Sequence, residues 1–287
     1  MSTILITGGK GFVGKKLAQQ LDKNGHEVIS FDVDNADISE KSALSIYFDR
    51  KVQHVFHLAA KTFVPDSWKS PYEFYRTNVL GTTSVLEFCR IAKVSLTYVS
   101  SYLYGEPEYL PIDEQHPIKA YNPYSHSKIL SEQLCEYYQK TFGIVITIFR
   151  PFNIFGPGQA DWFLIPKIVK QVASDAFQKI EVNDLRPKRD YVYVDDVIDA
   201  LVLSLKNISS IFNIGSGVSF SVEEIINIAM EVACISKKYQ SSNERRPIEI
   251  DNVVADIRWA KQQLGWTPQT SFKEGIKRCL EYYRTHC

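Results

Sequence analysis

The first half of the chain alternates short apolar runs with longer stretches in which apolar residues recur at helical spacing. The apolar runs end at glycine or polar residues and predict strands at residues 3–7, 27–32, 52–58, 96–101 and 144–149. The helical spacing predicts helices at residues 12–24, 41–49, 71–92 and 123–142. Because strands alternate with helices, we expect an α/β fold built on a doubly wound parallel Rossmann sheet.

After Arg150 the pattern becomes less regular, and prolines and glycines at positions 151 and 156–158 indicate a loop. Beyond this loop we predict strands at residues 180–182 and 191–194, and helices at residues 196–205, 222–234, 255–264 and 272–283. We therefore expect a dinucleotide-binding domain and a smaller, interleaved α/β lobe that binds the substrate. The domain comprises residues 1–155 and 189–215, and the lobe comprises residues 156–188 and 216–287.

A glycine-rich turn connects the first predicted strand to the first predicted helix. It reads Thr7-Gly8-Gly9-Lys10-Gly11-Phe12-Val13-Gly14. In this context the glycines permit a tight turn, close approach of the backbone to a pyrophosphate, and contact between helix and strand. The N–H groups at the start of the helix also favour phosphate. We expect the turn to bind a dinucleotide through Gly8, Gly11, Phe12, Val13 and Gly14.

Asp32 ends the second predicted strand, 18 residues after Gly14. A carboxylate at this point accepts a hydrogen bond from the adenosine ribose and repels a 2′-phosphate. No Arg or Lys follows Asp32 closely in the sequence, so we expect NAD(H) to be favoured over NADP(H). Asp37 and Ile38 are predicted to lie at the edge of the adenine.

Small residues follow the third predicted strand in His57-Leu58-Ala59-Ala60. They allow a ligand to lie against the carboxyl end of the strand, where sheets of this kind bind ligands. We interpret His57 as a core histidine rather than a catalyst. The remaining candidate cofactor contacts are Leu58, Ala59, Ala60, Lys61, Asn78 and Pro151.

Tyr124 and Lys128 lie in the fourth predicted helix, where their spacing places a phenol and an ammonium on one face. A nearby cation favours the phenolate, so a tyrosine in this position can exchange a proton near neutral pH. Ser100 lies at the end of the fourth predicted strand, 24 residues before Tyr124. Together with the glycine-rich turn, the three residues predict a catalytic site.

Composition and charge exclude several classes of function. The 287 residues include 33 Lys and Arg and 33 Asp and Glu without a basic stripe, so nucleic acid is not expected as a partner. The five cysteines lack C-x-x-C spacing, which indicates reduced thiols and no metal site. A strand at the N-terminus and the lack of an apolar run of about 18 residues predict a cytoplasmic protein without a signal peptide or membrane segment.

Several segments together resemble the extended short-chain dehydrogenase/reductases that act on nucleotide-diphosphate sugars. They are the glycine-rich turn, residues 57–60, residues 78–82, the run Ser100-Ser101-Tyr102-Leu103-Tyr104-Gly105, and Tyr124-x-x-x-Lys128. The resemblance implies that Tyr124 is a general acid/base on a sugar oxygen and that Ser100 hydrogen-bonds the same oxygen. It also implies that Lys128 binds the nicotinamide ribose and lowers the pKa of Tyr124, while the nicotinamide gives or takes the hydride.

The same resemblance implies a substrate site for a nucleotide-diphosphate sugar. Asn153 would contact the diphosphate, and Arg189 and Arg246 match the family's phosphate-binding arginines. Guanidinium groups suit a diphosphate because they present a planar fork of donors that is always charged. The other expected substrate contacts are Val64, Ser101 and Tyr102.

Three interpretations of the function remain open. Residues 60–68, 156–159 and 183–190 look most like GDP-4-keto-6-deoxy-mannose reductases, which favours an NDP-4-keto-6-deoxy-hexose reductase. A 4-epimerase with bound NAD uses the same three catalytic groups, and Asp32 leans toward it. A non-catalytic dinucleotide-binding sensor is the third interpretation, because fold does not fix function. A 4,6-dehydratase is disfavoured, since Tyr102 supplies no carboxylate where those enzymes carry one.

A second copy of the chain is the expected protein partner. The predicted helices at residues 71–92 and 123–142 carry more apolar positions than one face of a sheet needs, including Leu130, Leu134, Tyr137 and Tyr138. In the family these helices form a four-helix dimer interface. We therefore expect a homodimer.

Overall fold

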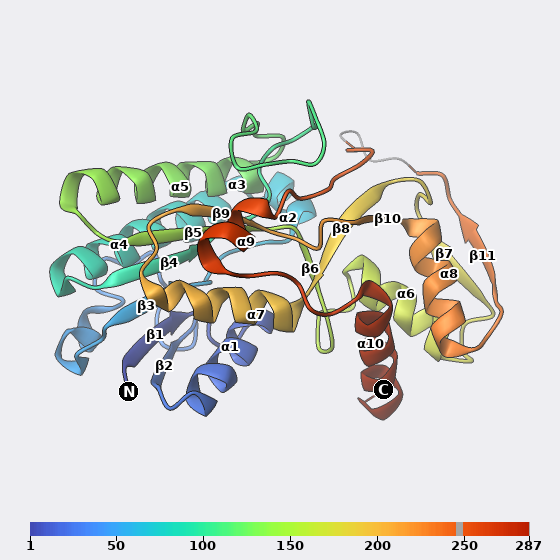
Figure 1. Cartoon of the computed structure of the whole chain (residues 1–287), viewed down its shortest axis with the longest axis horizontal. Helices are drawn as coiled ribbons and strands as arrows, with labels where there is room; N and C mark the ends of the chain where they lie inside the picture. Colours follow the sequence, from blue (N-terminus) through green and yellow to red (C-terminus); the bar gives the residue numbers. More distant parts are fainter. Residues whose placement is uncertain (245–248, 287) are drawn as a thin grey trace.

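The computed structural model describes residues 1–244 and 249–286, and its larger half is built on a six-stranded parallel sheet (Figure 1). The strand order is β2-β1-β3-β4-β5-β9. The strands are β1 (Thr3–Thr7), β2 (Glu27–Phe31), β3 (His54–His57), β4 (Ser95–Val99), β5 (Ile146–Pro151) and β9 (Ile211–Ile214). Since β2 and β3 lie on opposite sides of β1, the direction of winding reverses there, which confirms the doubly wound α/β fold.

Helices cover both faces of this sheet because side chains alternate between the faces along each strand. Leu5 packs with α4 (Gly81–Ala92) and α5 (Pro123–Phe142) on one face. Ile4 and Ile6 point to the other face, which is covered by α1 (Phe12–Lys23), α7 (Val194–Leu203) and α9 (Arg258–Leu264). The sheet is therefore buried on both sides, as its continuous apolar strands require.

Helix α5 has the bounds that the sequence predicts, because both of its ends carry strong signals. Asn122 and Ser125 form a capping box at the N-terminus, with Pro123 at the first helical position. Gly143 ends the helix in the left-handed conformation at φ 70°. These signals fix the helix that carries Tyr124 and Lys128.

Two of the predicted helices differ from the observed elements. The segment predicted at 41–49 contains a 3₁₀ helix, η1 (Ser45–Arg50). The segment predicted as one helix at 71–92 consists of α3 (Pro71–Phe74), a π-helical segment η2 (Tyr75–Leu80) and α4, and it is preceded by a short helix α2 (Val64–Lys69). The wider π turn, a feature often found at functional sites, carries Asn78.

Among its described residues, the smaller half contains two short sheets and the helices α6, α8 and α10 (Figure 1). One sheet has the order β10-β8-β6 and the other pairs β11 with β7. The elements are β6 (Asn153–Phe155), α6 (Leu164–Ala173), β7 (Lys179–Val182), β8 (Lys188–Tyr193), β10 (Ser219–Ser221), α8 (Val222–Ala233), β11 (Lys238–Ser241) and α10 (Phe272–His286). Helix α9 departs from the predicted division, because Ala260, Leu264 and Trp266 pack against the large sheet rather than in the lobe.

Asp190 on β8 holds together segments that are distant in the sequence. Its fully buried carboxylate accepts hydrogen bonds from the backbone N–H groups of Ser216 (2.6 Å), Gly217 (2.9 Å) and Ala255 (3.0 Å), and from the Ser216 hydroxyl (2.7 Å). Ser216 and Gly217 directly follow β9 of the large sheet. Asp190 therefore fixes the three-stranded sheet relative to the end of the large sheet.

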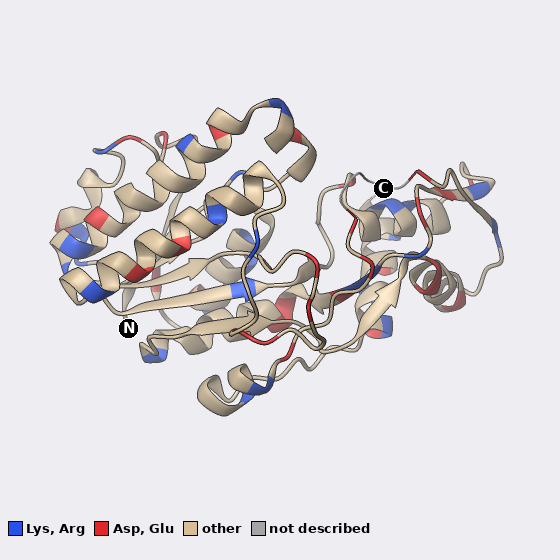
Figure 2. Cartoon of the chain, turned by 90° about the horizontal axis from the view of Figure 1, so that it is seen from above, with Lys and Arg blue, Asp and Glu red and all other residues tan. Residues whose placement is uncertain are grey.

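The surface carries charges of both signs on both halves (Figure 2). Within residues 1–244 and 249–286, none of the helices combines the length and the apolar character needed to span a bilayer.

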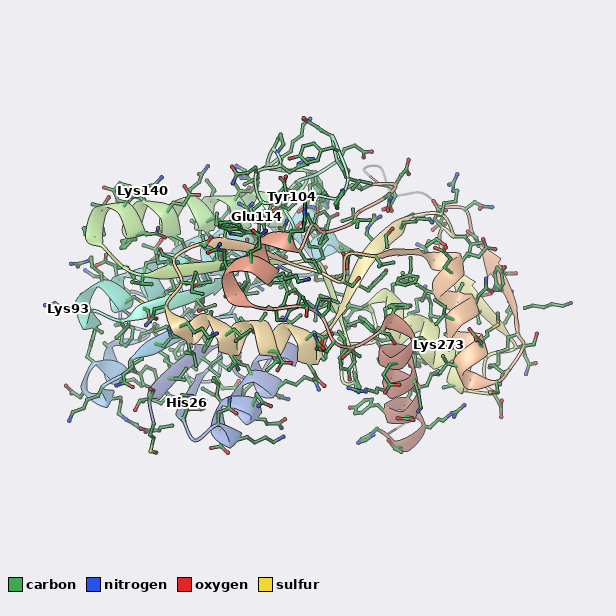
Figure 3. The ribbon with its side chains drawn as sticks, viewed as in Figure 1. His26, Lys93, Tyr104, Glu114, Lys140 and Lys273 are labelled. Atoms are coloured by element: carbon green, nitrogen blue, oxygen red, sulfur yellow. The ribbon has the colours of Figure 1, made fainter. Side chains whose placement is uncertain are left out.

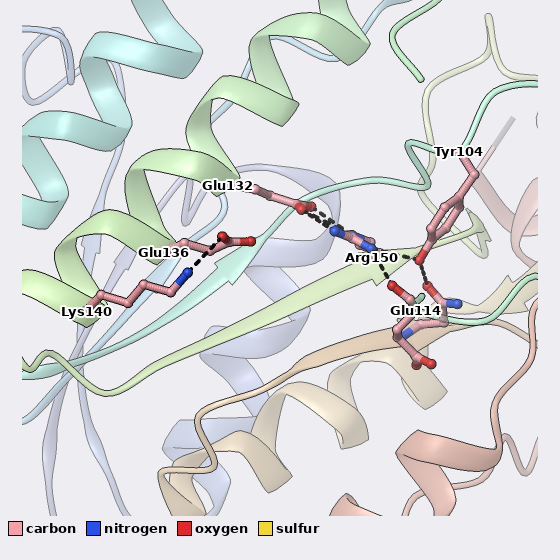
Figure 4. A network of polar contacts seen from close by, with 7 residues as sticks. Tyr104, Glu114, Glu132, Glu136, Lys140 and Arg150 are labelled. Atoms are coloured by element: carbon pink, nitrogen blue, oxygen red, sulfur yellow. Dashed lines mark hydrogen bonds and ion pairs between the residues drawn. The ribbon is translucent and has the colours of Figure 1, made fainter. Parts of the chain in front are cut away.

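A buried ion pair between Arg150 on β5 and Glu132 on α5 lies at the edge of the large sheet's core (Figure 4). Arg150 is 2% exposed, and its Nε and Nη2 donate to both carboxylate oxygens of Glu132 at 2.6–3.1 Å. Its Nη1 donates to the Tyr104 hydroxyl (3.1 Å) and to the Glu114 carbonyl (3.4 Å). The Tyr104 hydroxyl donates to Asn213 Oδ1 at 2.5 Å, and Figure 3 shows Tyr104 and Glu114 together above the sheet.

Arg150→Met is expected to lower the free energy of unfolding by ~3–5 kcal/mol, because it leaves the Glu132 carboxylate buried without its partner. Urea unfolding followed by circular dichroism measures this change. The matched control is Lys140→Met, which removes the cation of an exposed pair with Glu136 on the same helix and should change stability little. A loss for Arg150→Met as small as that of the control would contradict the role assigned to the buried pair.

Candidate active site

The glycine-rich turn brings the start of α1 against the carboxyl ends of β1 and β3. Gly8 has φ 75°, and a Cβ added there would lie 2.7 Å from the backbone nitrogen of Ala59. A Cβ on Gly14 would lie 2.1 Å from the Gly8 carbonyl oxygen. The missing side chains thus leave a narrow cradle of backbone, with Phe12 and Val13 in the first turn of α1. A dinucleotide diphosphate in this cradle stays a prediction from the sequence, and the N–H groups at the start of α1 suit it.

Asp32 lies at the end of β2, beside this turn. Its carboxylate accepts hydrogen bonds from the backbone N–H groups of Lys10 (2.9 Å) and Val33 (2.8 Å). The Lys10 ammonium lies 2.6 Å from Asp34, in an exposed ion pair. The sequence analysis considered only basic residues that follow Asp32 and so missed Lys10, which the folded turn brings close from 22 positions earlier.

The sequence predicts that Asp37 lies at the edge of the adenine. In the structure its carboxylate is bonded to other residues of the chain. Its carboxylate accepts from the Ser39 N–H (2.9 Å) and hydroxyl (2.7 Å) and forms an ion pair with Arg76 on η2. The Ser39 bonds, followed by Arg76, lower the pKa of Asp37 to about 2. Ile38 is buried against Gly81, where a Cβ would lie 2.8 Å from the Ile38 side chain.

His57 is a core histidine, as the sequence analysis expected. Its ring is 1% exposed and bonds Thr7 Oγ1 (2.7 Å) and Thr82 Oγ1 (3.0 Å). Because the Thr82 hydroxyl donates to the Asn78 carbonyl, His57 Nε2 carries the proton and Nδ1 accepts from Thr7. Burial lowers the pKa of His57 to about 3, so the ring is neutral.

Asn78 supports the loop after β3 through its own side chain. Its Oδ1 accepts from the Lys61 N–H (2.8 Å), and its Nδ2 donates to the Lys61 carbonyl (3.1 Å) and to the Ser127 hydroxyl (2.9 Å). The buried amide is thus bonded to the protein, and it acts on the predicted cofactor site by fixing the Lys61 backbone. Leu58, Ala59 and Ala60 precede this point and are half-buried, while Lys61 is exposed.

The end of β4 is where Lys128 and Ser100 lie, and Tyr124 lies one helical turn before Lys128 on α5. Lys128 is 2% exposed, and its ammonium donates to the Val99 carbonyl at 2.7 Å and lies 4.5 Å from the centre of the Tyr98 ring. The next residue, Ser100, is buried, and its hydroxyl has no hydrogen-bond partner within the described residues. A buried hydroxyl without a hydrogen-bond partner is uncommon, and it indicates that a bound ligand would supply the missing partner.

Burial shifts the pKa values of Lys128 and Tyr124 on α5 in opposite directions. Burial lowers the pKa of Lys128 to about 8, and Glu132, one turn further along α5, opposes this effect. Burial raises the pKa of Tyr124, and a side-chain hydrogen bond with Ser101 opposes that shift. The sequence predicts that Lys128 lowers the Tyr124 pKa, whereas in this structure burial raises it. Near neutral pH, Tyr124 is a phenol and Lys128 is mostly charged.

Aromatic side chains surround the predicted sugar-binding residues. Tyr102 stacks on Phe152 with ring centroids 5.5 Å apart and lies 6.4 Å from the Tyr121 ring. The Phe74 ring meets the Tyr124 ring edge-on at 6.3 Å. The other residues predicted near this point are Ser101 and Val64, both half-buried, and Pro151, which is buried at the end of β5.

The predicted diphosphate-binding residues lie on the strands of the smaller half. Asn153 on β6 donates from Nδ2 to the Asp190 carbonyl at 3.0 Å. Arg189 on β8 donates from Nη1 to the carbonyls of Lys188 (2.8 Å) and Ile250 (2.6 Å), and forms an ion pair with Glu249. The sequence analysis missed this acidic partner. Arg246 lies outside the described residues.

Glu132 and Arg150 are two further residues beside the candidate site that the sequence analysis missed. A signal for Glu132 is present, since it follows Lys128 by four positions in a predicted helix. Arg150 ends a predicted apolar strand, where a buried cation implies a buried anion near it. Neither pattern alone shows that the two side chains meet.

A groove of about 610 Å³ lies elsewhere on the surface, lined by residues that include Leu110, Ser216, Asn252 and Arg258. None of the predicted catalytic residues contributes to it.

Comparison with known proteins gives consistent matches over nearly the whole chain. The model of the NAD dependent epimerase/dehydratase family matches residues 4–215. A UDP-glucose 4-epimerase of Lactobacillus helveticus is 32% identical over 322 residues, covering 99% of this chain and 97% of that protein. A GDP-6-deoxy-D-mannose reductase of Pseudomonas aeruginosa is 29% identical over 290 residues, covering 96% and 95% of the two chains.

Solved structures agree with these matches. The UDP-glucose 4-epimerase of Thermotoga maritima, solved with UDP-glucose, is 27% identical with a TM-score of 0.91 and covers 99% of both chains. RMD from Pseudomonas aeruginosa, solved with NADPH, has the same identity and TM-score and covers both chains completely. The Thermus thermophilus UDP-glucose 4-epimerase, solved with NAD, is likewise 27% identical at 0.91, covering 99% and 100%.

Proposed function

The chain belongs to the NAD dependent epimerase/dehydratase family, and we propose that it transfers a hydride between a nicotinamide coenzyme and C4 of a nucleotide-diphosphate hexose. The observation that carries the proposal is the arrangement at the end of β4. A buried serine hydroxyl, unpartnered among the residues that the structure describes, directly follows the carbonyl that holds the Lys128 ammonium, and Tyr124 lies one helical turn before this lysine.

The residues around this point suit proton transfer to or from a sugar oxygen. Tyr124 holds its proton at neutral pH because burial raises its pKa, so it can donate to an oxygen that gains negative charge. Ser100 would hydrogen-bond the same oxygen with its free hydroxyl. A bound nicotinamide would supply or accept the hydride at the carbon. Lys128 would orient the coenzyme ribose and stabilise a developing phenolate, since its charge is buried beside the site.

Residues of the smaller half would position the diphosphate and the sugar. Arg189, Arg246 and Asn153 would bind the diphosphate, and Arg189 would exchange its contact with Glu249 for a phosphate oxygen. Val64, Ser101 and Tyr102 would contact the hexose. The Asp190 hydrogen bonds support this arrangement, because they fix β8 relative to the end of β9.

Within this chemistry we propose an NDP-4-keto-6-deoxy-hexose reductase. The segments at residues 60–68, 156–159 and 183–190 resemble those of such reductases, and a reductase is among the relatives. Dehydration would require an acid and a base beside C5 and C6. Tyr102, at the position where the dehydratases carry a carboxylate, packs against Phe152 and provides none.

A 4-epimerase is the second candidate, and the surroundings of Asp32 favour it. Two backbone N–H groups hold the Asp32 carboxylate, and the Lys10 ammonium is paired with Asp34 rather than free for a 2′-phosphate. This arrangement favours NAD(H) over NADP(H). An epimerase needs a retained NAD because the hydride returns to the same carbon from the opposite face.

Tyr124→Phe is expected to lower kcat by about 10²- to 10⁴-fold, because it removes the proton donor and retains the ring. Coenzyme affinity, measured by quenching of protein fluorescence, should change by less than about threefold, since the variant keeps Lys128 and the glycine-rich turn. Tyr137→Phe, on the exposed face of the same helix, is the control and should behave as wild type. Wild-type kcat in Tyr124→Phe would contradict the proposal.

The coenzyme released by denaturing the freshly purified protein distinguishes the two candidates. A reductase should release little coenzyme and should consume added NADH or NADPH when a 4-keto-6-deoxy nucleotide sugar is present. An epimerase should release NAD in near-stoichiometric amount, as mass spectrometry would show. A protein that neither carries a dinucleotide nor binds an added one would contradict both.

We also propose a homodimer through a four-helix bundle of α4 and α5. Ile91 on α4 is 54% exposed and Tyr137 on α5 is 59% exposed, although both are large and apolar or aromatic. Leu134 and Tyr138, which the sequence analysis counted toward the interface, instead pack on the chain's own core. The interface would therefore rest on a smaller set of side chains than the sequence suggests.

Light scattering should give twice the mass of one chain at micromolar concentration. Ile91→Glu combined with Tyr137→Glu should give a monomer, because charges would be buried at the interface. A wild-type monomer would contradict the proposed dimer without bearing on the catalytic proposal.

A further inference from the structure

Lys128 and Glu132 lie one turn apart on α5, and both are buried, at 2% and 3% exposure. The Lys128 ammonium is directed to the end of β4 by its hydrogen bond to the Val99 carbonyl. Burying an ammonium costs free energy unless an anion or several acceptors compensate its charge. One carbonyl 2.7 Å away compensates only part of that cost.

Arg150 fixes the Glu132 carboxylate in one orientation. Its Nε lies 3.1 Å from both carboxylate oxygens, and its Nη2 lies 2.6 Å from Oε2 (Figure 4). Arg150 is itself held from the other side by the Tyr104 hydroxyl and the Glu114 carbonyl. The carboxylate is therefore held toward Arg150 on β5, one helical turn along α5 from Lys128.

The other titratable groups around Lys128 are neutral. They comprise His57 on β3, Tyr98 on β4, and Tyr124 and Cys135 on α5. Burial keeps the pKa of His57 low and raises the pKa values of Tyr98, Tyr124 and Cys135. Among these described groups, Glu132 is the one that brings negative charge.

We infer that Glu132, held by Arg150, is a positioning residue that keeps Lys128 charged where its ammonium meets the end of β4. The inference rests on the proposed function, in which Lys128 must be an ammonium to orient the coenzyme ribose. Without the carboxylate, the buried Lys128 ammonium would lose its compensating anion and would release its proton at lower pH. Activity that depends on charged Lys128 is lost as pH rises through its pKa, so the loss would then begin at lower pH.

The Lys128 titration can be measured without any turnover. Protein labelled with [ε-¹³C]lysine would be titrated by NMR, and the signal missing from Lys128→Arg would identify Lys128. In the wild-type protein this signal should titrate near pH 8. In Glu132→Gln the midpoint should fall by about one pH unit or more, and the basic limb of kcat/KM should move with it.

Glu136→Gln is the matched control. Glu136 lies one turn beyond Glu132 on α5 and pairs with the exposed Lys140. Its removal should leave the Lys128 midpoint and kcat/KM unchanged. Glu132→Asp, which keeps the anion one methylene further back, should restore most of the wild-type midpoint.

If Glu132→Gln fails to fold, the double variant Glu132→Gln with Arg150→Gln tests the inference instead. The double variant removes both charges of the pair, so no unpaired Arg150 charge stays buried. Its Lys128 midpoint should lie between those of the wild type and Glu132→Gln. A midpoint equal to wild type in either folded variant would overturn the inference, as would a wild-type Lys128 already neutral at pH 7. Since NMR reads the titration directly, a failure of the proposed reaction remains distinguishable from a failure of this inference.

Discussion

The buried ion pair between Arg150 and Glu132 determines how the parts of the candidate active site meet. It joins β5 to α5, and through Tyr104 and the Glu114 carbonyl it also joins them to the loop that follows β4. Breaking one side of such a pair leaves a buried charge, which a fold of this size tolerates poorly. The same contacts therefore fix α5, which carries Tyr124 and Lys128, against β5.

The carboxylate of Asp190 is the second constraint, because it fixes the smaller half relative to the large sheet. Four hydrogen bonds from three separate residues place β8, and with it Arg189, next to the end of the large sheet. The proposed substrate would thus contact both halves of the molecule, which are held in place by the buried carboxylates of Glu132 and Asp190. Its diphosphate would lie on the smaller half and its hexose near Tyr124, consistent with substrates bound at the carboxyl ends of parallel strands.

The sequence predicts the elements well where local signals are strong, as in α5, whose proline, capping box and final glycine fix both ends. The sequence does not predict η2, because a single π-helical turn adds no distinct hydrophobic period to an apolar helical segment. It also misses contacts that only the folded chain creates, such as Lys10 beside Asp32 and Glu249 beside Arg189. The direction of the Tyr124 pKa shift could not be predicted from spacing, since it is set by burial, which only the folded chain creates.

Reduction at C4 of a 4-keto-6-deoxy-hexose is the reaction proposed for this site. The most direct measurement is the position of deuterium after the protein acts on a 4-keto-6-deoxy nucleotide sugar in the presence of NADH or NADPH deuterated at C4 of the nicotinamide, with ¹H NMR of the sugar product. Deuterium is expected at C4 of the hexose, in one configuration. Deuterium at another carbon, or a converted sugar without deuterium, would contradict it.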